Sequence, residues 1–218
     1  KQFLDDLINP RKFRDAFNLK HLSKDLSENL LKKMILIREA EKKIALERKL
    51  GIIGTPVHLA AGQEAIPTGI SENLSKNDYV FGAHRSHGHI LALGTSLRKL
   101  FAEILGKSTG LSKGYGGSMH LIDRSVGFMG SVPIVSGTTS LAVGAGFAIK
   151  QKKSNSIAIV YLGDGAVEEG VFHESLNLAS INNLPVIFVI ENNLFSSHMD
   201  LNKRQPSPFT SRFAKANL

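Results

Sequence analysis

Apolar side chains recur at intervals of three, four and seven residues over residues 23–51, with polar and charged residues between them. The apolar stripe consists of Leu26, Leu30, Met34, Ile37 and Ile44. Because this spacing places the stripe on one face of a helix, we predict a helix of about 27 residues here. Ser23 can cap its amino end, and Gly51 suits the stop after its carboxyl end.

Two apolar runs, at residues 157–162 and 186–190, are rich in β-branched residues and do not alternate with polar ones. This pattern is typical of strands that are covered on both faces of a parallel sheet. The segment 168–181 between them has a helical pattern, which predicts a right-handed strand–helix–strand crossover. Together with a small-residue helix at residues 138–150, these elements predict an α/β fold with a doubly wound, mostly parallel sheet.

Weaker signals occupy the middle of the chain. We predict short helices at residues 63–72 and 97–105, and a short strand at residues 78–82. Ten of the 20 glycines lie between residues 106 and 146. Because the segment 106–137 also has little periodicity, we expect it to be a loop.

The length of 218 residues suffices for one large domain. Residues 1–20 are polar and basic and are expected to form an N-terminal arm, and residues 21–218 one domain that is truncated at its C terminus. No apolar run reaches about 18 residues, and the first residues do not resemble a signal peptide. We therefore expect no membrane span and a cytoplasmic protein.

Composition excludes several classes of protein. Apolar residues make up 42% and charged residues 21%, as in globular domains rather than in disordered chains or fibres. The absence of cysteine excludes disulfide-stapled modules, thiolate metal sites and cysteine nucleophiles. The formal net charge of +8 suits an anionic ligand, an acidic partner or nucleic acid.

Polar residues follow both strong strand predictions. The first run leads into Gly163-Asp164-Gly165-Ala166, and the second into Glu191-Asn192-Asn193. Because ligands bind beyond the carboxyl ends of parallel strands, we expect Asp164 and Asn193 to lie side by side there. Their oxygen atoms suit Mg²⁺ or Ca²⁺, and the flanking glycines would let backbone N–H groups approach an anion. The alternative is a plain strand-to-helix turn with a capping aspartate.

The spacing of these two motifs carries a resemblance to a known family. Gly163-Asp164-Gly165, then 26 residues, then Asn192-Asn193 resembles the signature of thiamine-diphosphate enzymes. Further pieces agree in order: Val57-His58-Leu59, Gly62-Gln63-Glu64-Ala65, His84-Arg85-Ser86-His87-Gly88, Gly116-Gly117-Ser118-Met119-His120, Gly130 and Ile134-Val135. From about residue 20 onward, the chain resembles the α subunit of the thiamine-dependent 2-oxo acid dehydrogenases.

The resemblance implies a thiamine diphosphate-binding fold and a role for each matched position. The implied cofactor-binding residues are His84, Arg85, Pro133, Val135, Gly163, Asp164, Gly165, Ala166 and Asn193. Mg²⁺ would be held by Asp164, Asn193 and the backbone carbonyl of Phe195. Arg85 would pair with a phosphate, for which a planar guanidinium is well suited. The sequence departs from the family at His84, where a tyrosine is usual, and after Val135, where a glycine is usual.

The histidines have several interpretations. His58 and His87 would line the active site and are the predicted catalytic residues, although structural hydrogen bonding is the alternative for both. His84, His87 and His89 lie close in sequence, but their spacing and the lack of acidic neighbours make a zinc site a poor hypothesis. We expect Glu64, which begins a predicted helix, to cap that helix rather than to act on a cofactor.

In the family, an acid from a separate β subunit activates the pyrimidine ring of the cofactor. No convincing donor for that role is found in this sequence, which predicts a β subunit and an α2β2 heterotetramer. The implied reaction is decarboxylation of a 2-oxo acid and transfer of the acyl group to the lipoyl group of an acyltransferase. A family loop with a further histidine lies beyond the matched region.

Two alternatives stay open. The stretch Ser196-Ser197-His198-Met199 has a faint likeness to the acetoin dehydrogenase branch, which uses the same cofactor. A non-catalytic regulatory or nucleic-acid-binding protein that kept the fold would suit the charge of +8. The lysines are dispersed, however, and no basic patch with interleaved aromatic residues is found, which counts against nucleic acid.

Overall fold

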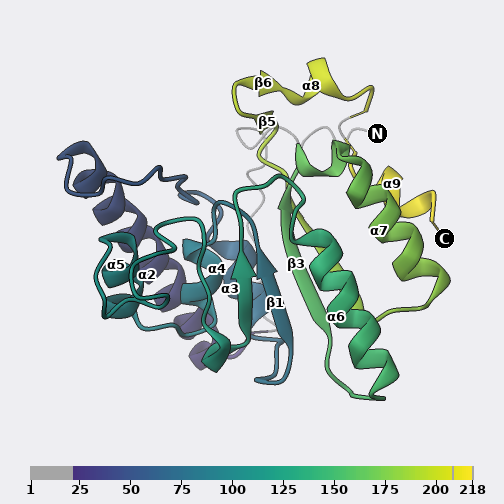
Figure 1. Cartoon of the computed structure of the whole chain (residues 1–218), viewed down its shortest axis with the longest axis horizontal. Helices are drawn as coiled ribbons and strands as arrows, with labels where there is room; N and C mark the ends of the chain where they lie inside the picture. Colours follow the sequence, from purple (N-terminus) through teal and green to yellow (C-terminus); the bar gives the residue numbers. More distant parts are fainter. Residues whose placement is uncertain (1–21, 208, 218) are drawn as a thin grey trace.

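The computed structural model describes residues 22–207 and 209–217 (Figure 1). The predicted N-terminal arm, residues 1–20, lies outside the described residues. Among the helices that are described, none has the length and apolar character needed to cross a membrane.

A sheet of four parallel strands lies at the centre of the fold, in the order β2-β1-β3-β4. The strands are β1 (Tyr79–Gly82), β2 (Phe128–Ser131), β3 (Ala158–Gly163) and β4 (Val186–Glu191). The last two pair over their full length, so that Gly163 lies opposite Glu191. This arrangement confirms the parallel strand–helix–strand unit and brings the carboxyl ends of β3 and β4 together.

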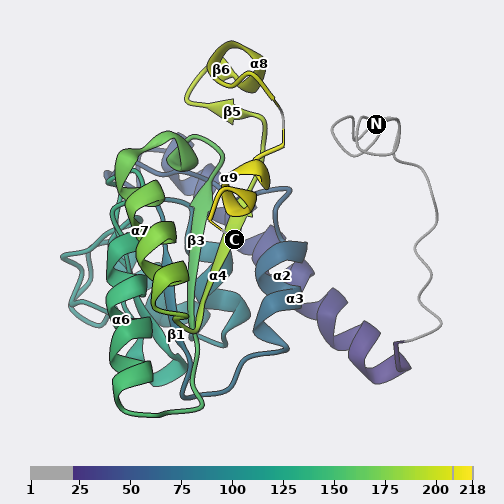
Figure 2. The ribbon, with the colours of Figure 1, turned by 90° about the vertical axis from the view of Figure 1, so that its right-hand side faces the viewer.

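Helices cover both faces of the sheet, which confirms the α/β fold (Figures 1 and 2). Side chains of β3 alternate between two hydrophobic cores, because successive residues of a strand point to opposite faces. Ile159 and Tyr161 belong to the core shared with α2 (Lys24–Lys49) and α4 (His87–Ala92). The core on the other face is shared with α6 (Thr139–Gln151) and α7 (Gly170–Ile181), and β3 contributes Val160 and Leu162 to it.

Helix α2 matches the predicted long helix closely. The Ser23 hydroxyl accepts a hydrogen bond from the Leu26 amide at 3.1 Å and so caps the helix. Gly51 follows the helix with a φ of +77°, a conformation that favours glycine. Ile37 and Ile44, from the predicted apolar stripe, are fully buried in the core.

Two predictions about the strands were wrong. Residues 106–137 are mainly irregular, but they include β2, which pairs in parallel with β1. A four-residue strand with a glycine in it has too little pattern to detect. The prediction that both apolar runs are covered on both faces holds for β3 but not for β4. Because β4 is an edge strand of the described sheet, its Ile187 side chain is 49% exposed.

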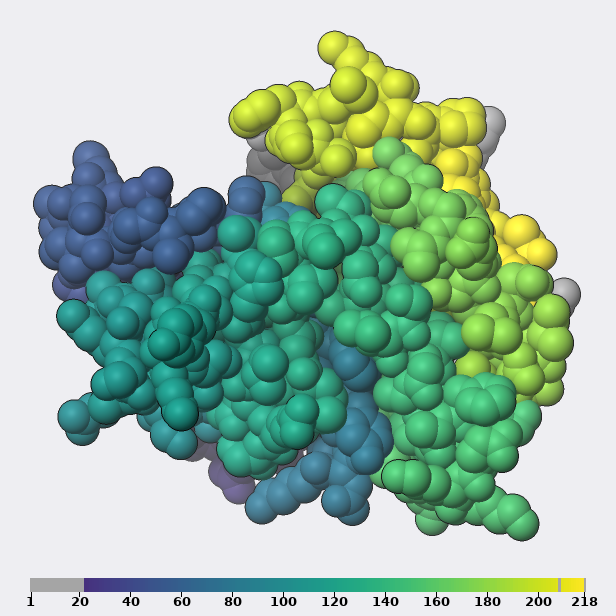
Figure 3. All heavy atoms as spheres, viewed as in Figure 1, coloured from purple at the N-terminus to yellow at the C-terminus, as the bar shows by residue number. Residues whose placement is uncertain are grey.

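Short elements complete the described chain. They are α3 (Ala65–Ser71), α5 (Leu97–Ile104), η1 (Arg124–Val126), η2 (Ala166–Glu168), β5 (Phe195–Ser196), β6 (Met199–Asp200), α8 (Leu201–Arg204) and α9 (Arg212–Lys215). The segment from β5 to α8 stands above the carboxyl ends of the strands (Figure 1) and forms the yellow-green region at the top of Figure 3.

Candidate functional site

A cavity of about 230 Å³ lies where β1, β3 and β4 end. It is lined by His58 and by all the residues predicted to bind cofactor or metal: His84, Arg85, Pro133, Val135, Gly163, Asp164, Gly165, Ala166, Asn193 and Phe195. These residues come from five separate stretches of the chain. The parallel sheet collects them at one edge, which is the usual place for a ligand in such a fold.

Asp164 follows β3 directly and its side chain is only 1% exposed. The Arg204 guanidinium donates a hydrogen bond from Nη2 to Asp164 Oδ2 at 2.5 Å, and Gln205 donates to the Asp164 carbonyl oxygen at 3.1 Å. Asp164 Oδ1 accepts no hydrogen bond from the part of the chain that the structure describes. One oxygen of this carboxylate is therefore available to a cation.

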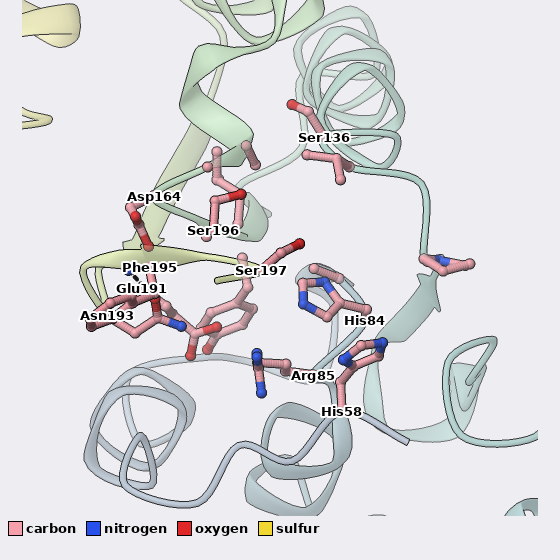
Figure 4. Close-up of a pocket in the computed structure, with 18 of the residues that line it drawn as sticks. His58, His84, Arg85, Ser136, Asp164, Glu191, Asn193, Phe195, Ser196 and Ser197 are labelled. Atoms are coloured by element: carbon pink, nitrogen blue, oxygen red, sulfur yellow. Dashed lines mark hydrogen bonds between the residues drawn. The ribbon is translucent and has the colours of Figure 1, made fainter. Parts of the chain in front are cut away.

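Asn193 follows β4 and lies on the same side of the cavity as Asp164 (Figure 4). Its Oδ1 accepts a hydrogen bond from the Phe195 amide at 2.9 Å, which holds the two residues in one tight turn. A carbonyl oxygen has two lone pairs, so Asn193 Oδ1 can still bind a cation. Within residues 22–207 and 209–217, no group of three or more acidic or histidine side chains could hold a metal. The predicted set instead combines one carboxylate with an amide and a backbone oxygen.

The turn after Asp164 comes close to β5. A Cβ atom on Gly165 would lie 2.5 Å from the Ser196 hydroxyl, so a larger residue here would displace the neighbouring segment. The amide groups of Gly165 and Ala166 donate no hydrogen bond within the described part of the chain. Two free N–H groups at a cavity wall suit an anionic oxygen.

Figure 4 shows His58, His84 and Arg85 together, across the cavity from Asp164 and Asn193. The two imidazole rings meet edge to face, with centroids 4.9 Å apart. Burial, followed by the positive charge of Arg85, lowers the pKa of His84 to about 4 and also lowers the pKa of His58 from 6.5. Both rings are therefore neutral at pH 7, and Arg85 is the cation on this side.

Arg85 has no carboxylate partner among the described residues, although its guanidinium donates to the Leu59 carbonyl oxygen. A half-buried guanidinium without an acidic partner beside a cavity favours an anionic ligand. Its position is therefore compatible with the phosphate contact expected of it.

Pro133 and Val135 lie in the segment that leads into α6, and the Val135 side chain is 51% exposed. The next residue, Ser136, has a φ of +57°, which is rare for a residue other than glycine. The resemblance of the sequence to the family predicted a glycine at this position. The Ser136 hydroxyl is hydrogen-bonded to the Thr139 hydroxyl at 2.8 Å, which helps to hold the unusual backbone in place.

His87 does not line the cavity, unlike the other predicted site residues. It is fully buried, with Nδ1 3.2 Å from both carboxylate oxygens of Glu41 and Nε2 2.8 Å from the Ser118 hydroxyl. Its predicted place in the active-site wall therefore does not match the structure, and structural hydrogen bonding describes it better. The short helix α4 turns this side chain toward α2 instead.

Comparisons with known proteins show the family of the chain. The family model described as "Dehydrogenase E1 component" matches residues 32–216, which is most of the chain. The chain belongs to the dehydrogenase E1 component family. It is similar to the α subunit of an acetoin:2,6-dichlorophenolindophenol oxidoreductase of Bacillus subtilis, with 44% identity over 164 residues, which is 75% of this chain and 49% of the relative.

It is also similar to the pyruvate dehydrogenase E1 component α subunit of Rhizobium meliloti, with 40% identity over 80% of this chain and 50% of the relative. A second acetoin:2,6-dichlorophenolindophenol oxidoreductase α subunit, from Cupriavidus necator, is 42% identical over 79% of this chain and 52% of the relative. The chain thus spans about half the length of these relatives.

The fold also places at or near the cavity three residues that were not predicted to belong to the site. Glu191 and Tyr161 line it, and His89 lies behind them, with Nε2 3.1 Å from Glu191 and its ring stacked 3.9 Å from that of Tyr161. Burial and the charge of Glu191 raise the pKa of Tyr161 above its usual value. Glu191 directly follows the apolar run 186–190, and this position could have indicated that it lies at the cavity.

Gln63 contributes a buried amide oxygen that has no hydrogen-bond partner in the described part of the chain. The neighbouring Glu64 occupies the N-cap position of α3, but its side chain makes no capping hydrogen bond, so the predicted capping role was wrong. Its carboxylate instead accepts hydrogen bonds from Arg38 at 2.5 Å and from the Gly62 amide at 2.8 Å. These contacts lower the pKa of Glu64 to about 2 and hold its carboxylate away from the cavity.

Proposed function

We propose that this chain forms the diphosphate- and metal-binding part of the α subunit of a thiamine-diphosphate-dependent 2-oxo acid dehydrogenase. The complete enzyme would decarboxylate a 2-oxo acid and pass the acyl group to a lipoyl carrier. The supporting observation is that Arg85, Asp164 and Asn193, from three strand ends, line one cavity in a member of the dehydrogenase E1 component family.

The residues present fit thiamine diphosphate and Mg²⁺. Asp164 and Asn193 offer free oxygen lone pairs and Phe195 a backbone carbonyl, which is the donor chemistry that Mg²⁺ prefers. The free amides of Gly165 and Ala166 and the guanidinium of Arg85 would bind the diphosphate oxygens. When bound, thiamine diphosphate supplies a carbon nucleophile for the keto carbon of the substrate.

Other residues of the cavity would orient the organic part of the cofactor and the substrate. The backbone of Pro133 and Val135 would face the pyrimidine ring. The unpartnered amide oxygen of Gln63 is available to an N–H donor. His58 and His84 would form an uncharged wall at the substrate side, with His58 as the catalytic candidate. The position of His87 supports only an indirect role, through Glu41 and Ser118.

We propose a β subunit as the partner, in an α2β2 assembly. The carboxylates that line the described cavity are Asp164 and Glu191, and His89 already holds Glu191. An acid for the pyrimidine ring would therefore come from another chain. The side chains of Ile134 and Phe195 at the cavity are 71% and 50% exposed, which suits coverage by a partner. A lipoyl-bearing acyltransferase and a cytoplasmic location complete the proposal.

The second candidate is the α subunit of an acetoin-cleaving enzyme with the same cofactor. It is favoured by the likeness to the Bacillus subtilis and Cupriavidus necator oxidoreductase subunits. The two candidates differ in substrate and not in the cavity residues assigned above. Turnover assays with pyruvate, branched 2-oxo acids and acetoin separate them.

The test is calorimetric titration of thiamine diphosphate with Mg²⁺ into the full chain, alone and together with the partner chain that co-purifies with it. We expect binding by the wild type, and weaker binding by about 10-fold or more when Asn193→Ala removes one metal ligand. Asn192→Ala is the matched control, because Asn192 forms the same kind of turn without lining the cavity. Absence of binding in the intact complex, or equal binding by Asn193→Ala, would contradict the proposal.

A further inference from the structure

Arg204 contacts Asp164 from outside the cavity. The Arg204 side chain is 7% exposed and does not line the cavity. Of the two carboxylate oxygens of Asp164, it contacts only Oδ2. The other carboxylate oxygen, Oδ1, has no partner in the described part of the chain. The guanidinium thus holds one oxygen of a carboxylate that belongs to a residue lining the cavity, and Arg204 itself is not part of that lining.

The same guanidinium joins two segments that carry proposed metal ligands. Arg204 also pairs with Glu168 and donates from Nε to the Met199 carbonyl oxygen at 3.2 Å. The adjacent Gln205, which is buried, donates to the Asp164 carbonyl oxygen and to Glu168 Oε1 at 2.7 Å. Residues 163–168 are therefore tied to residues 195–205.

This connection constrains the metal ligands relative to one another. Asp164 lies at the start of the first segment, and Phe195 at the start of the second. The residues that follow them, Gly165 and Ser196, lie so close together that a Cβ atom on Gly165 would not fit. A movement of Asp164 relative to the second segment would therefore break the buried hydrogen bond between Gln205 and the Asp164 carbonyl oxygen.

We infer that Arg204 is a positioning residue that gives the site its preference for Mg²⁺ over Ca²⁺, an inference that rests on the proposed function. Oδ2 keeps a lone pair, but a cation that approached it would meet the positive charge of the Arg204 guanidinium, so Oδ1 is the favoured oxygen of Asp164 for a metal. Mg²⁺ demands nearly ideal octahedral geometry, whereas Ca²⁺ accepts bidentate carboxylates and irregular shells. A carboxylate released from Arg204 can turn and offer both oxygens, which favours the larger ion.

The opposite interpretation is that Arg204 competes with the metal for Asp164. A competitor would enter the cavity and occupy the oxygen that faces it, but Arg204 lies outside the cavity lining and leaves Oδ1 free. The two interpretations predict opposite effects of removing the guanidinium, because loss of a competitor strengthens metal binding.

The experiment titrates Mg²⁺ and Ca²⁺ separately into the full chain in complex with the partner chain that co-purifies with it, at a fixed, saturating concentration of thiamine diphosphate and with calorimetric detection. For Arg204→Gln we expect Mg²⁺ binding to weaken by about 10- to 100-fold, the usual effect of losing a residue that orients a metal ligand. Ca²⁺ binding should weaken several-fold less, so the preference between the two ions changes. Lys203→Gln, which removes an exposed neighbouring charge, should leave both affinities unchanged.

Arg204→Lys keeps the charge but cannot reach both carboxylates with a planar fork, so it should give an intermediate preference. This variant decides the matter if Arg204→Gln fails to fold, as thermal unfolding will reveal. Equal losses for both ions, or tighter Mg²⁺ binding, would overturn the inference while leaving the proposed function in place. A wild-type complex with the partner chain that binds neither ion would overturn both.

Discussion

The two sides of the cavity balance their charges in different ways. On the side of Asp164, the chain supplies both signs, since the carboxylate is buried against Arg204. On the side of Arg85, the chain supplies one cation and two neutral imidazoles, His58 and His84, and no described carboxylate balances the guanidinium.

The difference separates stability from binding. A buried, paired charge is part of the folded structure, and removing one partner leaves the other uncompensated. A guanidinium without an acidic partner can be removed with little effect on folding, but it then no longer attracts an anionic ligand. Changes on the two sides should therefore appear in different measurements.

The largest effect is expected for Asp164→Asn. Loss of the Asp164 charge leaves Glu168 as the remaining carboxylate partner of the buried Arg204 among the described residues. We therefore expect the free energy of unfolding to fall by about 3 kcal/mol. Urea denaturation of the full chain, followed by circular dichroism, measures this. The double variant Asp164→Asn/Arg204→Gln should recover part of the loss. A single variant as stable as the wild type would show that the pair does not stabilise the fold.

Arg85→Gln should weaken ligand binding and leave the stability of the fold almost unchanged. Loss of a charge-assisted contact to phosphate weakens thiamine diphosphate binding by about 1.5–3 kcal/mol, or roughly 10- to 100-fold. The unfolding midpoint in urea should change little. Calorimetry with Mg²⁺ present measures the affinity, and Arg98→Gln, on the exposed face of α5, is the matched control. Equal affinity of Arg85→Gln and wild type for thiamine diphosphate would show that Arg85 does not bind the cofactor.

The smallest effect concerns His84 and pH. Its pKa in the folded chain, about 4, lies below the ordinary 6.5, so between these values the unfolded chain binds a proton that the folded chain does not. The contribution of neutral His84 to the free energy of unfolding is fully present above pH 6.5 and decreases as the pH falls toward 4. Because solvent screens a half-buried ring, we expect about 1 kcal/mol.

His84→Gln should flatten this part of the pH profile of unfolding free energy, though not fully, because the pKa of His58 is lowered as well. His120→Gln, which changes an exposed histidine outside the cavity lining, should keep the wild-type slope. If the slope persisted in His84→Gln, the burial of this ring would not be its cause.

The sequence predicted those parts of the site that depend on short segments. Asp164 and Asn193 follow apolar runs directly, so the topology of a parallel sheet was enough to bring them to one edge. Arg204 was not predicted, because it lies 40 residues from Asp164 and nothing in its own neighbourhood marks it. The contact between His89 and Glu191 spans 102 residues, and here too no local pattern was available.

The same limit explains the errors. His87 and His89 are two residues apart on α4, yet one contacts α2 and the other contacts the end of β4. His87 was predicted at the active site because its motif resembles the family, with structural hydrogen bonding as the alternative. Only the packing of α4 shows which of the two histidines lies next to the residues that line the cavity. In Glu64, the distant Arg38 overrode the local preference for a helix cap.

The contacts of His87 have a consequence for searches that compare active sites by geometry. Ser118, His87 and Glu41 are linked hydroxyl to imidazole to carboxylate, the connectivity of a serine hydrolase. Each of these side chains is at least 99% buried, so no ester or peptide can reach the hydroxyl. In this chain the connectivity fastens α2, α4 and the glycine-rich loop together. A hydrogen-bond pattern alone does not distinguish such a structural contact from a catalytic serine, whereas the exposure of the hydroxyl to solvent does.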